Sequence, residues 1–206
     1  MDPNGGKKDM FNKLSKDQCL DLLNKEKFNR ITVSFYKYIF LENLEIMRDD
    51  LYSQWDALLA LGRVYISREG INAQLSIPEK NWEKFKSTIN ANHAFKMINF
   101  KIAANQEKSF FKLTIKVKDK IVADGLSIDE YDVTNVGKHL SAKEWNKFID
   151  LGATVVDMRN HYESEIGRFQ EAICPTSETF REELPMVKDI LKGKEKEKIL
   201  LYCTGG

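Results

Sequence analysis

Hydrophobic positions change their spacing several times along the first half of the chain. Residues 30–40 form a run of β-branched and aromatic side chains that is typical of a buried strand. Apolar residues then recur at helical spacing and predict an amphipathic helix that ends near Gly62: Leu44, Met47, Leu51, Trp55, Leu58 and Leu59. Two strands at 63–67 and 72–77 and a helix near 81–90 follow. The predicted order is therefore strand, helix, strand, strand, helix.

A further strand at 111–117 shows the alternation of a half-exposed strand. Leu113, Ile115 and Val117 occupy its inward positions. The outward positions are polar or basic: Lys112, Thr114, Lys116 and Lys118. We expect this strand to complete a split βαβ, ferredoxin-like or acylphosphatase-like α+β domain over residues 30–121.

The segments on either side of this domain have weaker patterns. Residues 1–29 are predicted to form an N-terminal arm and a short helix, which a capping box at Ser15 and Gln18 opens. Residues 122–140 lack clear periodicity and contain two glycines. We interpret this second segment as an irregular linker.

A second unit is predicted over residues 141–206. A capping box at Ser141 and Glu144 opens a helix that we expect to bury Trp145 and Phe148. Two short apolar runs, at 153–157 and 198–202, predict strands. The sequence between them, around 180–191, predicts a helix. Strands that alternate with helices imply a parallel α/β sheet, which differs from the fold of the first domain.

Functional residues of parallel sheets gather at the carboxyl ends of the strands. One such end carries Asp157 and Arg159, which we interpret as an ion pair that orders the strand tip and supports the neighbouring loop. The other carries Cys203 and a candidate active-site loop: Thr204, Gly205 and Gly206. Backbone N–H groups of such a loop would stabilise a thiolate, the nucleophilic form of cysteine, although a lone cysteine is more often a small core residue.

Composition narrows the class of protein. The 206 residues are 42% hydrophobic and 31% charged, with 11 Gly and 4 Pro, which excludes fibrous and wholly disordered chains. No apolar run approaches the ~20 residues needed to cross a bilayer, and the first residues contain no apolar signal core, so we expect a cytoplasmic protein without a membrane partner. Cys19, Cys174 and Cys203 are odd in number and widely spaced, which argues against a disulfide framework or a zinc ribbon.

Charge points to one local surface. The formal net charge is only +1, so the bulk charge does not indicate a nucleic-acid partner. Between positions 96 and 120, however, seven lysines are accompanied only by Glu107 and Asp119. Lys112, Lys116 and Lys118 could therefore contact phosphates, while an ordinary solvated sheet face explains the same pattern equally well.

Arg63 and Arg68 are a second candidate surface for RNA phosphates. They lie beside the predicted turn at Glu69 and Gly70. The alternative is that 68–72 forms only a tight turn, with Gly70 at positive φ. Metal chemistry has little support, because the three histidines are scattered, and no Gly-x-Gly-x-x-Gly fingerprint for a nicotinamide or flavin is present.

Several separated motifs resemble known families. Two stretches and the strand-end cysteine resemble the first half of a rhodanese domain: 154–163 (TVVDMRNHYE), 166–173 (IGRFQEAI) and 203–206 (CTGG). Together with 62–73 (GRVYISREGINA) and 180–182 (FRE), they are similar to the rhodanese-like tRNA uridine hydroxylases. The resemblance covers roughly residues 30–206.

This resemblance implies oxygen-dependent conversion of the wobble uridine (U34) of tRNA to 5-hydroxyuridine. Cys203 would be the active-site cysteine, and molecular oxygen the cosubstrate, with an electron donor that the sequence does not identify. The resemblance also implies that the cysteine loop continues past Gly206, so we expect a rhodanese-like domain that is incomplete at its C-terminus and a chain that is inactive as it stands.

Two other functions stay open. In a sulfurtransferase, Cys203 would accept sulfane sulfur from thiosulfate or a protein sulfur donor, and Cys174 is then a candidate to resolve the persulfide. In a binding module, the rhodanese-like fold would only recognise a ligand.

Overall fold

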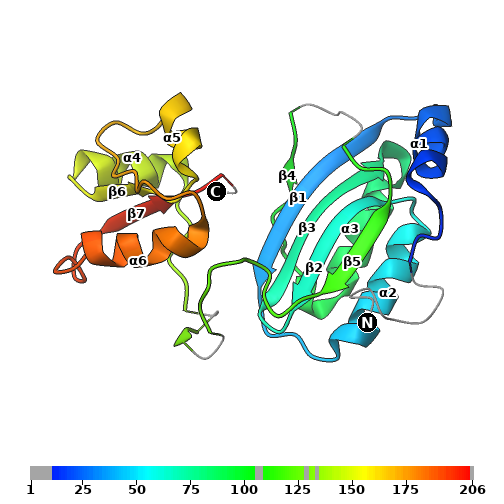
Figure 1. Ribbon diagram of the computed structural model, residues 1–206, viewed down its shortest axis with the longest axis horizontal. Coiled ribbons are helices and arrows are strands. Elements are labelled where there is room, and N and C mark those ends of the chain that lie inside the picture. The colour runs from blue at the N-terminus through cyan, green and yellow to red at the C-terminus, as the bar shows by residue number, and fades with distance from the viewer. Residues whose placement is uncertain (1–10, 105–108, 128–129, 133–134, 205–206) are drawn as a thin grey trace. The chain divides into compact units, whose positions relative to one another are not determined.

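The computed structural model describes residues 11–104, 109–127, 130–132 and 135–204 (Figure 1). The chain divides into two compact units, residues 1–122 and 123–206. Every helix within the described residues is too short or too polar to cross a membrane.

The first unit is built on a five-stranded sheet with the order β4-β1-β3-β2-β5 (Figure 1). β1 pairs antiparallel with β3 and β4, β2 pairs antiparallel with β3, and β5 pairs parallel with β2. The strands are β1 (Arg30–Tyr38), β2 (Leu61–Ser67), β3 (Gly70–Pro78), β4 (Lys101–Ile102) and β5 (Leu113–Val117).

The helices of this unit are α1 (Lys16–Lys25), α2 (Leu44–Asp56) and α3 (Trp82–Ala91), with 3-10 turns η1 (Glu79–Asn81) and η2 (His93–Phe95). The predicted capping box at Ser15 is confirmed, because Ser15 Oγ accepts the N–H of Gln18 while the Gln18 side chain accepts the N–H of Ser15. The predicted end of the second helix near Gly62 is wrong. Gly62 lies in β2 at a φ of +143°, where a Cβ would come 2.1 Å from the carbonyl oxygen of Gln74.

The strand that closes the split βαβ unit is not the one that the sequence indicated. Two-residue β4 takes the edge position beside β1, which completes the ferredoxin-like order β4-β1-β3-β2. The strand predicted at 111–117 is β5, a fifth strand at the opposite edge. A strand of two residues has no periodicity to detect. The sequence pattern therefore indicates the longer, clearly alternating segment at 111–117 as the last strand of the split βαβ unit.

One face of this sheet packs against α2 and α3 to form the core. Phe35 of β1, Trp55 of α2 and Phe85 of α3 are at most 2% exposed. The Trp55 ring lies 5.3 Å from that of Phe85 and 6.4 Å, edge-on, from that of Phe35. Truncating a buried ring of this kind typically costs about 3–5 kcal/mol, so the three rings fix the helices on the sheet.

The opposite sheet face carries the alternate positions of each strand, and we call it the open face. It includes Ser34, Tyr36 and Tyr38 of β1, Asn72 and Gln74 of β3, Arg63 and Tyr65 of β2, Thr114 and Lys116 of β5, and Lys101 of β4. The alternation predicted for β5 is confirmed, since Leu113 and Ile115 are buried while Lys112 and Lys118, which flank the strand, are exposed.

The turn between β2 and β3 anchors the end of the first unit. Glu69 is fully buried, and its Oε1 accepts the N–H of Ile121 at 2.6 Å. The side-chain amide of Asn72 donates to the carbonyl oxygen of the same residue, Ile121, at 3.2 Å. Gly70 has a φ of +147°, and a Cβ there would come 2.0 Å from the carbonyl oxygen of Lys37. These residues therefore have a structural role in the turn.

The second unit contains a two-stranded parallel sheet, as the pattern indicated. Its elements are α4 (Ala142–Asp150), β6 (Thr154–Asp157), α5 (His161–Ile166), α6 (Phe180–Ile190) and β7 (Ile199–Tyr202). The capping box at Ser141 is confirmed, and a small core forms around Val156 and Val187. The prediction that α4 buries Trp145 and Phe148 is wrong, because both are only half-buried. Six-residue α5 was not predicted, since it is too short for helical periodicity.

We expect Gly70→Ala to destabilise the first unit by roughly 2–4 kcal/mol, because the new Cβ must move the Lys37 carbonyl while the backbone keeps a strained φ. Hydrogen exchange of β1 and β3 peptides in increasing urea measures this unit separately. Gly137→Ala is the control, since nothing lies within 4 Å of a Cβ at that position. Equal protection in both variants would contradict the proposed close approach.

Candidate active site

Cys203 lies just after β7, exposed, at the edge of an open hollow in the second unit. The hollow is formed by the ends of β6 and β7 and by the segment around α5, and its lining residues are Arg159, Glu163, Gly167, Arg168, Phe169, Tyr202, Cys203 and Thr204. A thiol, two guanidinium groups and one carboxylate thus share this hollow.

The buried carboxylate of Asp157, at the end of β6, organises one side of the site. Arg159 binds it through two hydrogen bonds, from Nε to Oδ1 at 2.9 Å and from Nη2 to Oδ2 at 2.7 Å. The hydroxyl of Tyr202 donates to Oδ2 at 2.7 Å. Arg159 also donates to the carbonyl oxygen of Gly167 at 2.6 Å and lies over the Tyr202 ring, 5.2 Å from its centroid. The predicted ion pair therefore exists and joins β6, β7 and the end of α5.

Burial of Asp157 acts to raise the pKa of its carboxyl. The hydrogen bonds from Arg159 and Tyr202 outweigh burial and hold that pKa below its usual range. The hydrogen bond to Asp157 in turn raises the pKa of Arg159. Burial, and then the bond to Asp157, raise the pKa of the Tyr202 phenol. Asp157 is thus an anion and Arg159 a cation at neutral pH.

The cysteine loop is tied to α5 through its next residue. The hydroxyl of Thr204 is 2.7 Å and 3.0 Å from the two carboxylate oxygens of Glu163, to which it donates. Arg168, from the segment after α5, donates to the carbonyl oxygen of Ser164 at 3.3 Å and has its side chain at the hollow. A guanidinium that is not paired with Asp157 is therefore available to attract an anion.

Aromatic rings form the wall behind these groups. Phe169 packs edge-on against Tyr202 at 4.9 Å between ring centroids. Trp145 of α4 lies 5.5 Å from the ring of Phe169 and 6.1 Å from that of Tyr202. This packing accounts for the half-buried position of Trp145, which faces the site wall instead of a central core.

Comparison with known proteins finds a family match within the first unit. Residues 30–121 match the family described as UPF0176 acylphosphatase like domain. We call residues 30–121 the acylphosphatase-like domain. In this domain, β5 pairs parallel with β2 and lies outside the four strands of ferredoxin-like order.

Curated relatives align with nearly the whole chain. A tRNA uridine(34) hydroxylase of Leptospira interrogans serogroup Icterohaemorrhagiae serovar Lai is 54% identical over 202 residues, which are 97% of this chain and 55% of the relative. Proteins of the same name from Yersinia enterocolitica and Yersinia pestis are 44% identical over 200 residues, 96% of this chain and 57% and 56% of their own lengths. The chain spans a little over half the length of the curated relatives it matches.

The structure brings some of the predicted site residues together. Cys203, Thr204 and Arg159 line one hollow, and Asp157 lies buried behind Arg159. Gly205 and Gly206, predicted as part of the active-site loop, lie outside the described residues. Cys174 does not line the hollow, and its thiol donates to the carbonyl oxygen of Ala172 at 3.5 Å.

Five lining residues were not predicted as site residues from the sequence: Glu163, Gly167, Arg168, Phe169 and Tyr202. Tyr202 could have been identified because it immediately precedes Cys203 at the same strand end. The other four come from or follow α5, whose position against the strands depends on tertiary structure. In the described part of the chain, no group of three or more His, Cys, Asp and Glu side chains is placed to hold a metal ion.

The predicted RNA-binding residues lie in the acylphosphatase-like domain. Arg63 and Lys116 are on the open face, and Lys112 and Lys118 flank β5 beside it. The ammonium of Lys118 lies 5.9 Å from the ring centroid of Tyr65, which places this lysine over the open face. Arg68 is exposed in the turn between β2 and β3 and is not part of either strand.

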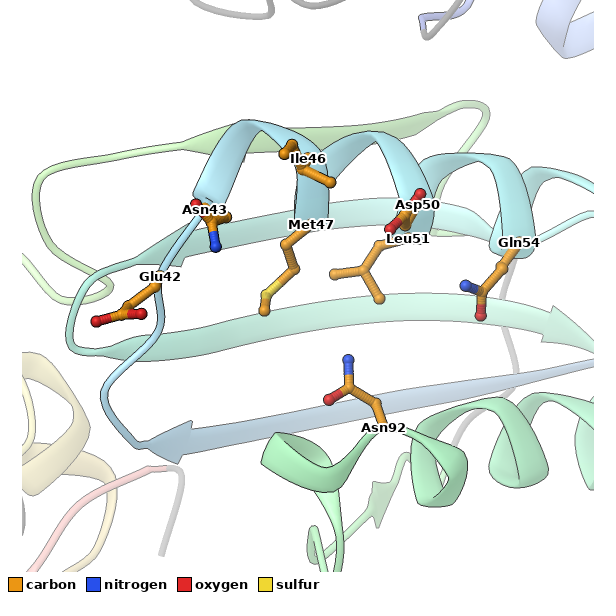
Figure 2. A pocket seen from close by; sticks show the side chains of 8 residues that line it. All are labelled: Glu42, Asn43, Ile46, Met47, Asp50, Leu51, Gln54 and Asn92. Carbon is orange, nitrogen blue, oxygen red and sulfur yellow. The ribbon is translucent and has the colours of Figure 1, made fainter.

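A hollow of this domain lies on its helical side, between α2 and the segment before η2. Figure 2 shows Met47 and Leu51 pointing into it from α2, with Asn92 facing them. Its charged lining residues, Glu42 and Asp50, are both acidic. This hollow is therefore unsuited to a polyanion, in contrast to the open face.

Glu183 gives the second unit a testable pH dependence. Its side chain, on α6, is 2% exposed, and among the described residues no donor reaches its Oε1. Burial, with a smaller effect of Asp157, raises its pKa from 4.5 to about 7. Between these values the folded state holds a proton that the unfolded state has lost, so stability falls as the pH rises, by a total on the order of 3 kcal/mol.

We therefore expect Glu183→Gln to stabilise the second unit relative to the parent chain at pH 8 and to have little effect near pH 4.5. Hydrogen exchange of β6 and β7 peptides in urea, measured from pH 4.5 to 8.5, gives both profiles. Glu182→Gln, an exposed neighbour on the same helix, should leave the profile unchanged. Parallel profiles of Glu183→Gln and the parent would contradict the raised pKa.

Proposed function

We propose that this protein converts U34 of tRNA to 5-hydroxyuridine. The observation that carries the proposal is the alignment of 96–97% of the chain with tRNA uridine(34) hydroxylases at 44–54% identity. The geometry is compatible with this activity, because an exposed thiol shares a hollow with two guanidinium groups at the carboxyl ends of parallel strands.

In this proposal Cys203 is the nucleophile of the site. Arg168 supplies positive charge at the hollow that attracts an anionic substrate. Arg159, already bound to Asp157 and to Gly167, is a positioning residue that holds the ends of β6 and β7 in place. Thr204, through Glu163, fixes the start of the cysteine loop.

The proposed cosubstrate is molecular oxygen, and we propose no bound cofactor. Insertion of one oxygen atom into the C5–H bond of uracil leaves the other atom to be reduced to water, which consumes two electrons and two protons. An external electron donor is therefore part of the proposed reaction. We also propose that the reaction takes place in the cytoplasm, where its tRNA substrate is found.

The acylphosphatase-like domain is proposed to bind the tRNA. Lys116 of β5 and the flanking Lys112 and Lys118 occupy same-face positions beside the open face, where neighbouring positions are about 7 Å apart. This distance is close to the spacing of successive phosphates on a nucleic-acid strand. Arg63, also on the open face, extends the same basic surface.

We expect Cys203→Ser to abolish U34 hydroxylation, measured in a protein that contains this chain and has the full length of the curated relatives. A hydroxyl at this position ionises far less readily than a thiol and is the weaker nucleophile, while the exposed position makes the fold tolerant of the change. Nucleoside analysis of tRNA from cells that express each variant measures the product.

Cys19→Ala and Cys174→Ala are the matched controls, and both should retain activity. Hydroxylation by Cys203→Ser would refute the assigned nucleophile, and loss of activity in Cys174→Ala would assign that role to a second thiol. In cells that lack the gene, loss of 5-hydroxyuridine derivatives supports the hydroxylase. Loss of thiolated nucleosides instead would indicate a sulfurtransferase, and unchanged tRNA would indicate a binding module.

Replacing Lys112, Lys116 and Lys118 by Gln should weaken tRNA binding and reduce its salt dependence. Up to about three fewer counterions are released on binding, so the slope of log affinity against log salt concentration should fall by up to about three. Stability should change by less than about 0.5 kcal/mol, as is usual for exposed positions. Binding titrations at several salt concentrations give the slope.

The control for this variant replaces three exposed lysines outside the open face, Lys16, Lys25 and Lys84, by Gln. Equal loss of affinity and slope in both triple variants would show only a general charge effect. Unchanged binding in the first variant would move the RNA surface elsewhere.

A further inference from the structure

The open face carries aromatic rings that the lysines alone do not explain. Tyr36 of β1 and Tyr65 of β2 lie in one row across the sheet, each directly opposite Asn72 of β3. Lys116 of β5 continues this row beyond Tyr65. Tyr36 is 39% exposed, and Tyr65 is half-buried beneath the Lys118 ammonium. Two rings that are two strand spacings apart, about 10 Å, can each take a separate planar ligand.

The neighbouring row of the open face is polar. Gln74 lies at its centre, exposed, between Ser34 on β1 and Arg63 on β2. The row ends at Lys101 of β4 and Thr114 of β5. The Asn72 amide donates to the carbonyl oxygen of Ile121 in the first row, so Gln74 is the amide better placed to meet a ligand.

The charge of the sheet is of one sign. The five strands contain no Asp or Glu, and on the open face they contribute Arg63, Lys101 and Lys116. Lys112 and Lys118 add two cations at the ends of β5. Such a surface attracts a polyanion. A protein partner would instead be expected to bury an apolar patch, whereas most positions of the open face are polar.

The combination of rings, an amide and cations selects unpaired nucleotides. Stacking on aromatic rings needs bases that are free of a duplex, because paired bases hide their planes inside the helix. Four-stranded sheets of RNA-recognition motifs stack two or three bases on aromatic side chains in this way, and here the likeness to them is an analogy of fold only.

We propose that the open face binds unpaired nucleotides of the tRNA by stacking bases on Tyr36 and Tyr65. Gln74 then meets a base edge, and Arg63, Lys116 and Lys118 contact the phosphates between the stacked bases. This proposal rests on the proposed function, and it adds that the acylphosphatase-like domain recognises a single-stranded segment of the RNA.

The test measures binding of the chain to a fluorescein-labelled, uridine-rich single-stranded RNA of about 12 nucleotides and to its perfectly paired duplex. Tyr36→Ala and Tyr65→Ala are each compared with Tyr36→Phe and Tyr65→Phe, which keep the ring. Each alanine variant should lose roughly 5- to 100-fold in affinity for the single strand, while each phenylalanine variant should bind within about two-fold of the parent chain.

Salt dependence separates stacking from phosphate contacts. Loss of a ring should lower affinity without changing the slope of log affinity against log salt, whereas the triple lysine variant should change both. Hydrogen exchange of β1 and β2 peptides identifies any variant whose sheet has lost stability. If Tyr65→Ala loses stability in this way, the Tyr36 pair and Gln74→Ala still decide the proposal.

Three results would overturn it. Alanine variants that bind the single strand as the parent does would reduce the face to phosphate contacts. A duplex that binds as tightly as the single strand would remove the need for free bases. Polyglutamate that binds as tightly as the RNA, with the same dependence on the tyrosines, would point to an acidic protein segment. Each can occur while tRNA from expressing cells still contains 5-hydroxyuridine, so failure here is distinguishable from failure of the proposed function.

Discussion

A buried carboxyl group needs either hydrogen-bond donors or a proton of its own, and this constraint shapes both units of the chain. Glu69 and Asp157 are each at most 1% exposed. An ionised carboxylate at such a position is strongly unfavourable unless donors surround it. Glu69 obtains the backbone N–H of Ile121, and Asp157 obtains Arg159 and Tyr202. Since Ile121 and Tyr202 are far from their acceptors in the sequence, these pairs fix where distant segments meet.

In the second unit, this pairing decides which groups are left for chemistry. Arg159 has its guanidinium committed to Asp157 and Gly167, and Tyr202 has its hydroxyl committed to Asp157. Arg168 is bound only through a carbonyl oxygen at 3.3 Å within the described residues. The site therefore separates a structural cation from a cation that can face a substrate. Cys203 is exposed beside both because β7 ends where Tyr202 is held.

In the acylphosphatase-like domain, the corresponding pairing limits the open face. The backbone of Ile121 is held by Glu69 and Asn72, so the chain leaves the domain at the end of the sheet near the β2–β3 turn. The rows that contain Tyr36, Tyr65, Gln74 and Arg63 extend from there across β1, β3 and β2. On the other side of the sheet, the core of aromatic rings holds the strands in place. This packing involves none of the polar side chains of the open face.

The sequence by itself determined the long elements, both capping boxes, the direction of the β5 lysines and the position of Cys203 at a strand end. These features depend on local periodicity and on short-range hydrogen bonds, which are visible in consecutive residues. Only the tertiary structure decided that two-residue β4 closes the sheet, that α5 exists, and that Glu163, Arg168 and Phe169 reach the cysteine. It also decided that Trp145 faces the site wall and that Tyr36 and Tyr65 share a row. These depend on strand register and on contacts between segments tens of residues apart, for which a single sequence carries no local signal.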